Sequence, residues 1–205
     1  MYYDTVKTNQ SFNVLIEGIV EDNNEISDYW VGSGVIISED GYILTAKHCV
    51  EGSDYIKVTL PNREEFIITD FYLDEEYDFA IIKLPIEVTQ YAVLGDSNDL
   101  SKGNIIYNIG NAGGIWRDKV TFGTVYDNHF KRIILDDLEY VFSKMKVAGG
   151  CSGGGVYRYN KLIGVVSLGG YNSCWIVPIN EIKRDFTWYK NLMEVLTKPT
   201  PEKGS

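Results

Sequence analysis

The stretch Gly149-Gly150-Cys151-Ser152-Gly153-Gly154-Gly155-Val156 holds one serine among five glycines, directly ahead of a strand-like run. Glycine lets backbone N–H groups turn toward a common point and lets another chain approach closely. A serine that attacks a carbonyl group needs such donors, because they hold the oxyanion that forms. Taken alone, the stretch is equally compatible with a flexible loop, since glycine clusters usually mark turns. Two other parts of the sequence favour the first interpretation.

Those two parts supply a histidine and an aspartate. His48 follows the run Tyr42 to Ala46, and Asp78 directly precedes the strand-like run Phe79 to Leu84. Alone, each residue is most simply a strand end or a turn residue. A serine hydroxyl, however, is a poor nucleophile unless a base takes its proton, and histidine does so best when a carboxylate fixes its tautomer. The sequence therefore predicts a catalytic triad of His48, Asp78 and Ser152, in that order along the chain.

The surrounding pattern predicts an all-β fold. Short strand-like runs recur about every ten residues, the spacing of a sandwich or barrel. Gly32 to Ile37 and Tyr42 to Ala46 flank an Asp40-Gly41 turn, which is a strong hairpin signal. Residues 1 to 10 are polar and are expected to be peripheral, ahead of a first strand over Ser11 to Val20.

Helical periodicity is expected only near the C-terminus. Asn180 can cap a segment that runs to about Leu196, with apolar residues at spacings of three and four. We expect this amphipathic helix to lie over the strands, and residues 197–205 to form a disordered tail.

Composition limits the partners. The chain has 205 residues, 44% of them hydrophobic, and a net charge of −10, with no run of Lys or Arg. The charge therefore argues against nucleic acid and anionic membranes as partners, since phosphate binding needs a basic face. No segment approaches the length of a membrane span. The sequence carries no metal-ligand spacing, so no metal or other cofactor is expected.

The cysteines and the N-terminus suggest a cellular location. Three cysteines, Cys49, Cys151 and Cys174, are an odd number and argue against a disulfide framework. The first residues show no basic region followed by an apolar run. On these grounds a cytoplasmic or otherwise intracellular protein is expected.

Around His48, Asp78 and Ser152 the sequence resembles the chymotrypsin/trypsin-like serine peptidases, most closely their bacterial HtrA (Deg)-type branch. The resemblance covers about Gly32 to Ile179 and rests on motifs in family order: Gly32-Ser33-Gly34-Val35-Ile36-Ile37, Thr45-Ala46-Lys47-His48, Asp78-Phe79-Ala80-Ile81-Ile82, Asn108-Ile109-Gly110-Asn111, Val120-Thr121-Phe122-Gly123-Thr124-Val125 and the Ser152 stretch.

The resemblance implies a double six-stranded antiparallel β-barrel with a C-terminal helix. The first barrel would span about residues 11–100, the second about 101–180 and the helix about 180–196. It implies a serine endopeptidase that acts on a protein or peptide substrate through an acyl-enzyme intermediate. His48 would be the base, Asp78 its orienting partner, and the N–H groups of Gly150 and Ser152 the oxyanion hole. Ser167, Leu168 and Gly169 would pair with the substrate backbone and line the primary pocket.

Several departures leave alternatives open. Lys146 falls at the floor of the primary pocket in related enzymes, which suggests a preference for acidic side chains unless it points to solvent. Leu168 and Cys174 suggest instead a small or medium apolar pocket. Cys151 could be the nucleophile, although only Ser152 fits the Gly-x-nucleophile-Gly-Gly frame.

Two further expectations concern the chain as a whole. The segment after Ile179 leaves room for a helix and a tail but not for the PDZ module common in the HtrA-type branch. The competing function is a binding or scaffold protein that keeps the fold with a latent or silent site, because the glycines around Ser152 could let the loop rest in an inactive form. The sequence does not indicate an oligomeric state.

Overall fold

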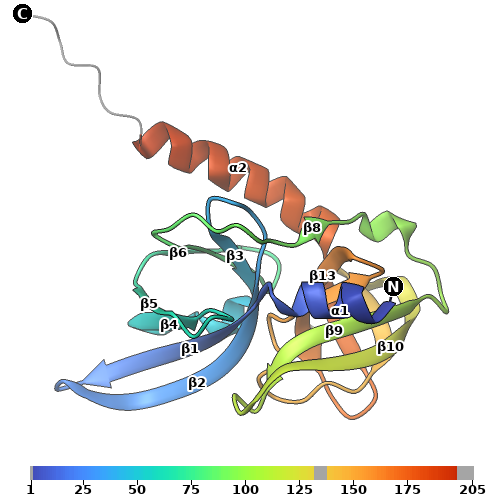
Figure 1. Ribbon diagram of the computed structural model, residues 1–205, viewed down its shortest axis with the longest axis horizontal. Helices are drawn as coiled ribbons and strands as arrows, with labels where there is room; N and C mark the ends of the chain where they lie inside the picture. Colours follow the sequence, from blue (N-terminus) through green and yellow to red (C-terminus); the bar gives the residue numbers. More distant parts are fainter. Residues whose placement is uncertain (1, 132–137, 198–205) are drawn as a thin grey trace, which may run out of the picture.

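Two β-barrels lie side by side, and a long C-terminal helix runs across the edge of both (Figure 1). The computed structural model describes residues 2–131 and 138–197. The helix, α2 (Ile179–Thr197), contacts β13 and β14 of the second barrel, and it reaches the first barrel through Phe186, whose ring packs edge-on against Tyr42. The predicted all-β fold with a C-terminal helix is confirmed.

The first barrel is built from strands that run antiparallel in the order β5-β4-β1-β2-β3-β7-β6. These strands are β1 (Asn13–Asp22), β2 (Glu25–Ile36), β3 (Tyr42–Thr45), β4 (Tyr55–Thr59), β5 (Glu65–Ile68), β6 (Phe71–Leu73) and β7 (Ala80–Lys83). The edge strands β5 and β6 are separated only by Thr69 and Asp70, so they are two halves of one interrupted strand. Counting them together gives a closed barrel of six strands.

The second barrel follows the order β12-β9-β10-β11-β14-β13-β8. Its strands are β8 (Val93–Leu94), β9 (Ile105–Ala112), β10 (Trp116–Lys131), β11 (Glu139–Met145), β12 (Gly155–Arg158), β13 (Lys161–Gly169) and β14 (Cys174–Pro178). Because β12 pairs with both β9 and β13, six antiparallel strands close on themselves. The short β8 adds a parallel pairing to β13 outside this barrel.

Hydrophobic alternation and glycine turns place these strands. The predicted hairpin is confirmed: Gly34 pairs with Thr45, and Gly41 in the turn has a φ of 81°, which glycine adopts without strain. The central strands β3 and β7 are buried on both faces, and Ile43, Ile81 and Ile82 have no exposed surface. Burial of such side chains is the main stabilising contribution to each barrel.

An N-terminal helix, α1 (Tyr2–Gln10), was not expected from the polar segment that forms it. Tertiary contacts hold it in place: Asn9 donates a hydrogen bond to the Tyr107 hydroxyl at 2.8 Å, and Gln10 donates to the Asp118 carbonyl at 2.8 Å. Tertiary hydrogen bonds can override weak local helix propensity. The tail predicted beyond Thr197 lies outside the described residues. Within residues 2–131 and 138–197, no helix has both the length and the apolar character needed to span a bilayer.

Candidate active site

His48 and Asp78 are brought together by the pairing of β3 with β7. His48 lies on a short 3-10 turn, η1 (Lys47–Cys49), just after β3, and Asp78 lies two residues before β7. Because Thr45 pairs with Ala80, the two chain ends meet on the same side of the barrel. The His48 ring nitrogen Nδ1 lies 2.9 Å from Asp78 Oδ2 and 3.1 Å from Oδ1, and the His48 backbone N–H also donates to Oδ1 at 3.1 Å.

Ser167 completes the environment of this carboxylate from the second barrel. Its hydroxyl donates a hydrogen bond to Asp78 Oδ2 at 2.6 Å, and the residue is buried on β13. Asp78 therefore accepts from both barrels, which fixes its orientation toward the imidazole. The sequence singled out Ser167 for its backbone, and this hydroxyl contact was missed because no local pattern pairs residues so far apart.

The electrostatic setting of His48 favours its protonated form. The hydrogen bond to Asp78 is the main cause that raises the pKa of His48 above its ordinary value, and contact with the Cys49 side chain is the second. Burial opposes this rise, but the His48 side chain is half exposed, so solvent remains available to it. A neutral imidazole whose protonated form is stabilised in this way is suited to receive a proton from a nucleophile.

Ser152 lies beside the segment that leads into His48. The Ser33 backbone N–H donates to the Ser152 carbonyl at 2.7 Å, which joins the loop to β2. The next residue, Gly153, has a φ of 77°, and any side chain there would collide with the Ser33 carbonyl and the Thr45 hydroxyl. The loop at Gly153 approaches the segments at Ser33 and Thr45 so closely that only glycine fits there. Ser152 itself is partly exposed, so a ligand can reach it.

Two backbone N–H groups of the loop are available to a ligand. Within the described parts of the chain, the N–H groups of Gly150 and Ser152 donate to no acceptor, whereas those of Cys151 and Gly153 donate to Ala148 and Val166. The Gly149 carbonyl accepts from the Gly113 N–H at 2.6 Å. Because a trans peptide places C=O and N–H on opposite sides, the Gly150 N–H points away from Gly113.

A buried hydroxyl from the first barrel fixes the same loop. Ser33 Oγ donates to the Gly150 carbonyl at 2.7 Å and accepts from the Asn111 N–H at 2.7 Å. The side-chain amide of Asn111 donates to the Val14 carbonyl at 2.8 Å. The loop that carries Ser152 is thus held by both barrels. The sequence analysis noted the motif Gly32-Ser33-Gly34, but it did not predict that the Ser33 side chain would hold this loop.

The three cysteines are buried free thiols. Burial raises the pKa of the Cys151 thiol above its ordinary value, which disfavours the nucleophilic thiolate at neutral pH. Cys49 packs against Gly32, and its thiol lies 3.6 Å from the Ser152 carbonyl oxygen. These contacts are those of structural thiols.

The residues predicted to bind substrate lie on or near the end of β13. Ser167 is buried, Leu168 is 46% exposed, and Gly169 is exposed and packs so closely on Val147 that a side chain there would collide with it. Lys146 is exposed, and its ammonium lies 4.6 Å from the centre of the Tyr171 ring, which is also exposed. The structure thus places Lys146 at the surface beside this region.

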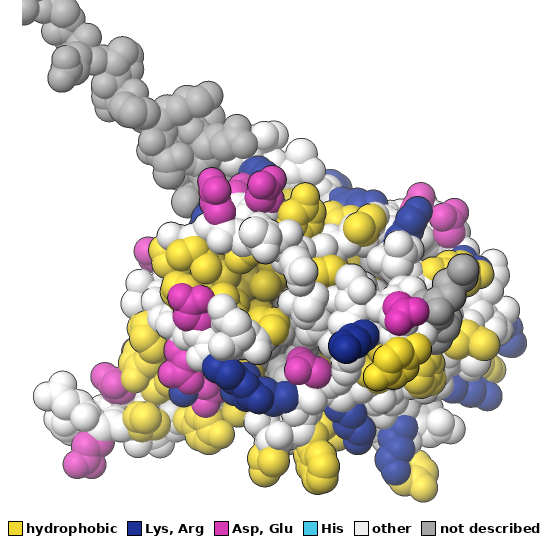
Figure 2. Space-filling view, in the orientation of Figure 1, with side chains coloured by type: hydrophobic (Ala, Val, Ile, Leu, Met, Phe, Trp, Pro, Cys, Tyr) yellow, Lys and Arg dark blue, Asp and Glu magenta, His cyan; other side chains and the backbone are white. Residues whose placement is uncertain are grey.

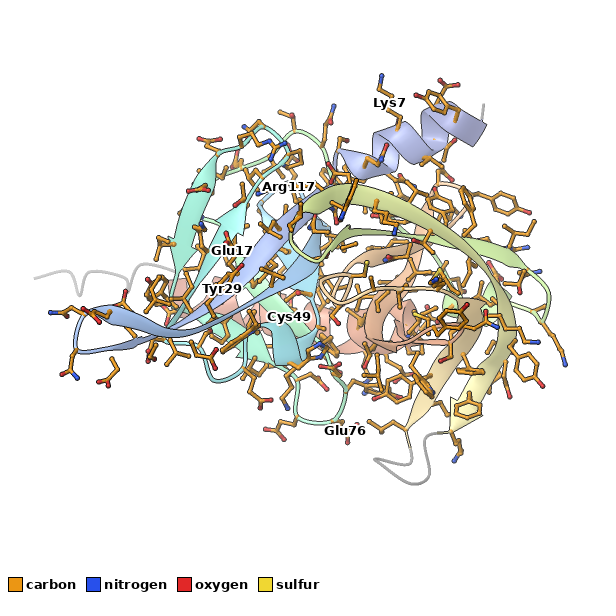
Figure 3. The ribbon with its side chains drawn as sticks, turned by 90° about the horizontal axis from the view of Figure 1, so that it is seen from below. Lys7, Glu17, Tyr29, Cys49, Glu76 and Arg117 are labelled. Carbon is orange, nitrogen blue, oxygen red and sulfur yellow. The ribbon has the colours of Figure 1, made fainter. Side chains whose placement is uncertain are left out.

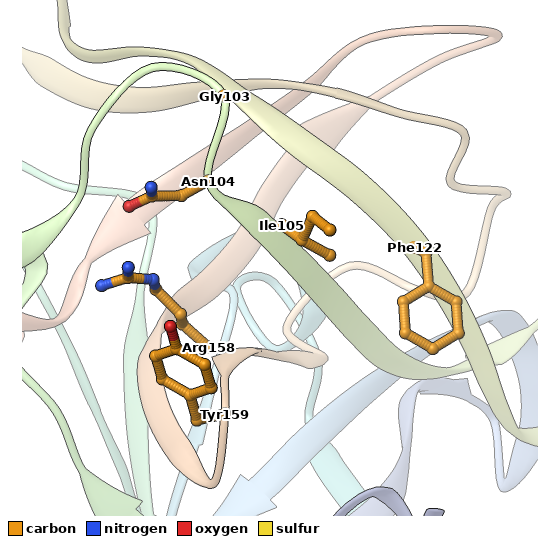
Figure 4. A pocket seen from close by; sticks show the side chains of 6 residues that line it. All are labelled: Gly103, Asn104, Ile105, Phe122, Arg158 and Tyr159. Carbon is orange, nitrogen blue, oxygen red and sulfur yellow. The ribbon is translucent and has the colours of Figure 1, made fainter. Parts of the chain in front are cut away.

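Other features of the surface lie apart from these residues. A cavity of about 600 Å³ is lined by Ile105, Phe122, Arg158 and Tyr159 of the second barrel, and none of the predicted site residues contributes to it (Figure 4). On the face shown in Figure 2, Lys and Arg side chains are interspersed with Asp and Glu. Among the residues that the structure describes, no three His, Cys, Asp or Glu side chains are grouped as metal ligands.

Comparison with known proteins identifies the family. Residues 32–165 match the family model of the trypsin-like peptidase domain. The chain is 36% identical over 159 residues to a DegP-like periplasmic serine endoprotease of Halomonas elongata, covering 73% of this chain and 33% of that protein. It is 32% identical over 103 residues to the serine endoprotease DegS of Haemophilus influenzae, covering 50% of this chain and 29% of the relative.

Solved structures share the fold. The HtrA-type protease AlgW with a bound tripeptide superposes with a TM-score of 0.81 at 23% identity, covering 91% of this chain and 62% of that one. AlgW with a decapeptide gives a TM-score of 0.78 at 22% identity, covering 92% and 68%. The chain spans about a third or less of the length of the DegP-like and DegS relatives.

The predicted intracellular location is contradicted by the relatives. Those from Halomonas elongata and Chlamydia trachomatis are both named periplasmic serine endoproteases. The prediction failed because it relied on an odd number of cysteines and on the first residues of the chain. Buried free thiols are chemically protected in any compartment, and so they carry little information about redox environment.

Proposed function

Because this chain belongs to the trypsin-like peptidase domain family, we propose that it is an HtrA-type serine endopeptidase with Ser152 as its nucleophile. One observation carries the proposal. The Asp78 carboxylate holds His48 Nδ1 at 2.9 Å, and the loop that carries Ser152 approaches the segment before His48, with two N–H groups that have no acceptor among the described residues. These parts are the ones that peptide-bond cleavage by serine requires.

In the first step, Ser152 Oγ attacks the carbonyl carbon of the scissile bond while its proton passes to His48 Nε2. Asp78 accepts from His48 Nδ1–H and stabilises the imidazolium that forms. The negative charge that develops on the substrate oxygen is held by the N–H groups of Gly150 and Ser152. The tetrahedral intermediate then collapses, the C–N bond breaks, and the leaving amine takes the proton from His48 Nε2.

In the second step, water replaces the amine. His48 removes a proton from the water, the hydroxide adds to the acyl-enzyme ester, and the same two N–H groups hold the second oxyanion. Ser152 leaves with the proton from His48, and the product is a new carboxylate. Each step uses side chains and N–H groups that the two barrels jointly position.

The substrate backbone is proposed to pair with the end of β13. Leu168 and Gly169 are exposed there, next to the buried Ser167 that holds Asp78. An extended peptide that adds to this edge would bring its carbonyl to Ser152 while its side chains alternate between the pocket and solvent. This arrangement fits a protein or peptide substrate in extended form.

The periplasmic names of the relatives favour a site of action outside the cytoplasm. AlgW has been solved with bound peptides, which is consistent with peptide substrates for this fold. We propose accordingly that this chain cleaves unfolded or extended segments of proteins in the periplasm or outside the cell.

A binding or scaffold protein with a silent site is not favoured. A silent site would be expected to lack a catalytic residue or to fill the oxyanion position with an internal acceptor. Here His48 and Asp78 are hydrogen-bonded, and the N–H groups of Gly150 and Ser152 stay unpaired within the described residues.

Peptide hydrolysis by three matched proteins tests the proposal. The wild type and Cys151→Ala are expected to cleave a denatured protein substrate, and Ser152→Ala to leave it intact, with all three folded by circular dichroism. Acid quenching during turnover is expected to trap an acyl-enzyme on Ser152, detected by intact mass. Activity that survives in Ser152→Ala but disappears in Cys151→Ala would assign the nucleophile to Cys151 instead.

A further inference from the structure

A second cavity, of about 650 Å³, adjoins the loop that carries Ser152. Its walls come from two hairpins and the loop itself: Tyr29 and Val31 on β2, Trp116 and Lys119 on β10, and Gly149 and Gly150 on the loop. None of the residues predicted from the sequence to line the primary pocket contributes to it. The cavity therefore touches the reaction centre through Gly150 alone.

The side of the loop on which this cavity lies can be derived from contacts. Val147 packs against Gly169, at the end of β13 where the substrate is proposed to pair. Two residues further along, the Gly149 carbonyl accepts from the Gly113 N–H in the β9–β10 turn. The loop thus has the β13 edge on one side and the cavity on the other. A substrate that runs along β13 up to its scissile bond would leave the site toward the cavity.

The cavity is strongly aromatic and exposed. Trp116 is 72% exposed and Tyr29 is 56% exposed, although large apolar side chains usually seek burial. Tyr29 lies on the β1–β2 hairpin, which extends beyond the body of the first barrel (Figure 3). Contiguous exposed apolar surface next to a reaction centre is a mark of a ligand site.

The walls of the cavity are fixed in position. The indole N–H of Trp30, the neighbour of Tyr29, donates to the Cys49 carbonyl at 2.9 Å, and its ring packs on Gly18. Gly114 faces Val31 so closely that a side chain there would be tightly packed against it. Both hairpins are therefore anchored to each other and to the segment after His48. A preformed pocket of this kind binds with little loss of conformational freedom.

We infer that this cavity is a binding subsite for an aromatic or large apolar side chain in the leaving-group half of the substrate. Gly150, which lines the cavity, is only two residues from Ser152, and an extended chain advances about 3.3 Å per residue. We therefore assign the side chain to one of the first three residues after the scissile bond. Lys119 on the wall disfavours a Lys or Arg at that position through like-charge repulsion. The inference rests on the proposed function, which sets the direction of the substrate.

Binding and cleavage measured together test this subsite. The probes are internally quenched peptides that share their residues before the scissile bond and carry Phe, Gly or Lys at each of the three positions after it. Phe at one position is expected to raise kcat/KM about tenfold over Gly, from burial of the ring, and Lys to give the lowest value. Trp116→Ala is expected to abolish the preference for Phe.

The control variant is Ile115→Ala. Ile115 is 81% exposed in the same turn but does not line the cavity, so this variant is expected to keep the Phe preference of the wild type. Hydrolysis of a methyl ester, whose leaving group is methanol and places no ring in the cavity, is expected to be the same in all three proteins. Equal Phe-to-Gly ratios in the wild type and in Trp116→Ala would overturn the inference.

Peptide binding to Ser152→Ala separates this inference from the proposed function. This protein keeps the cavity, and it is expected to bind the Phe peptide about tenfold more tightly than the Gly peptide. Adding Trp116→Ala should remove the difference. A missing difference in binding would overturn the subsite even if the wild type is an active protease. Its presence would support the subsite even if the wild type fails to cleave any peptide, which would overturn the proposed function alone.

Discussion

The hydroxyl oxygen of Ser33, in the first barrel, lies 2.7 Å from the carbonyl oxygen of Gly150, in the loop of the second barrel that carries Ser152. The same residue donates its backbone N–H to the Ser152 carbonyl at 2.7 Å. One residue of β2 therefore holds the loop on both sides of Cys151. The position of the proposed oxyanion donors depends on how the two barrels meet.

Ser33→Ala is expected to lower kcat/KM about a hundredfold with little change in KM, because small shifts of a catalytic loop have effects of that order. The substitution also leaves the buried Gly150 carbonyl and Asn111 N–H without the hydroxyl partner, at a cost of about 1–3 kcal/mol in stability. Steady-state kinetics and thermal unfolding of the same preparations measure both effects.

Ser143→Ala is the matched control. Ser143 is also fully buried, and its hydroxyl donates to a backbone carbonyl, that of Cys174, at 3.4 Å. It lies on β11 and contacts no residue of the proposed triad, so its loss is expected to affect stability but to change kcat/KM only a few-fold. Equal losses of activity in the two variants would argue that Ser33 has no specific role in the loop.

Asp78→Asn is expected to lower kcat about 10⁴-fold and to alter the pH dependence. Since His48 must be neutral to accept a proton, kcat/KM should rise with pH through the pKa of His48. Asp78 raises that pKa above its ordinary value of about 6.5, so the limb of the profile lies at higher pH in the wild type than in Asp78→Asn. Coincident limbs in the two profiles would show that Asp78 does not act on His48.

The same raised pKa predicts how stability depends on pH. Because the pKa of His48 is higher in the folded than in the unfolded protein, the contact with Asp78 stabilises the fold fully below about pH 6.5 and is lost as pH rises through the folded-state pKa. The difference in Tm between the wild type and His48→Ala should therefore be larger at about pH 5.5 than at about pH 9. A Tm difference that grows with pH would contradict a raised pKa of His48 in the folded protein.

Profiling of the residue before the cleaved bond tests two alternatives for the primary pocket. Lys146 lies at the surface with its ammonium over the Tyr171 ring, whereas Val147 packs against Gly169. We expect small or medium apolar residues to be preferred, with the profile unchanged in Lys146→Ala. Enrichment of Asp or Glu that disappears in Lys146→Ala would instead support the acidic preference.

Local patterns in the sequence were sufficient to predict an all-β fold and the first hairpin, because strand periodicity and the Asp40-Gly41 turn are features of neighbouring residues. The double barrel was implied by the resemblance to the chymotrypsin/trypsin-like peptidases. The structure places His48 and Asp78 within hydrogen-bond distance, as the predicted triad requires, while the catalytic roles stay a prediction. The contacts that the sequence did not predict are tertiary contacts. The hydroxyl contacts of Ser33 and Ser167 join residues 117 and 89 positions apart, and no local signal marks them.

The N-terminal helix shows the same limit. The segment that forms α1 is polar, and its side chains Asn9 and Gln10 are held by residues about a hundred positions away. The exposed aromatic cavity at Trp116 and Tyr29 is likewise assembled from two hairpins that are distant in sequence. Features that arise where the barrels meet therefore required the structure.

The central claim is that Ser152 is an activated nucleophile with its oxyanion donors in place. Labelling of the purified protein with a fluorophosphonate, read by intact mass, tests it most directly. The account predicts one phosphonyl group per chain on the wild type and on Cys151→Ala, and none on Ser152→Ala. A folded wild-type protein that takes up no label, or a label that persists on Ser152→Ala, would contradict it.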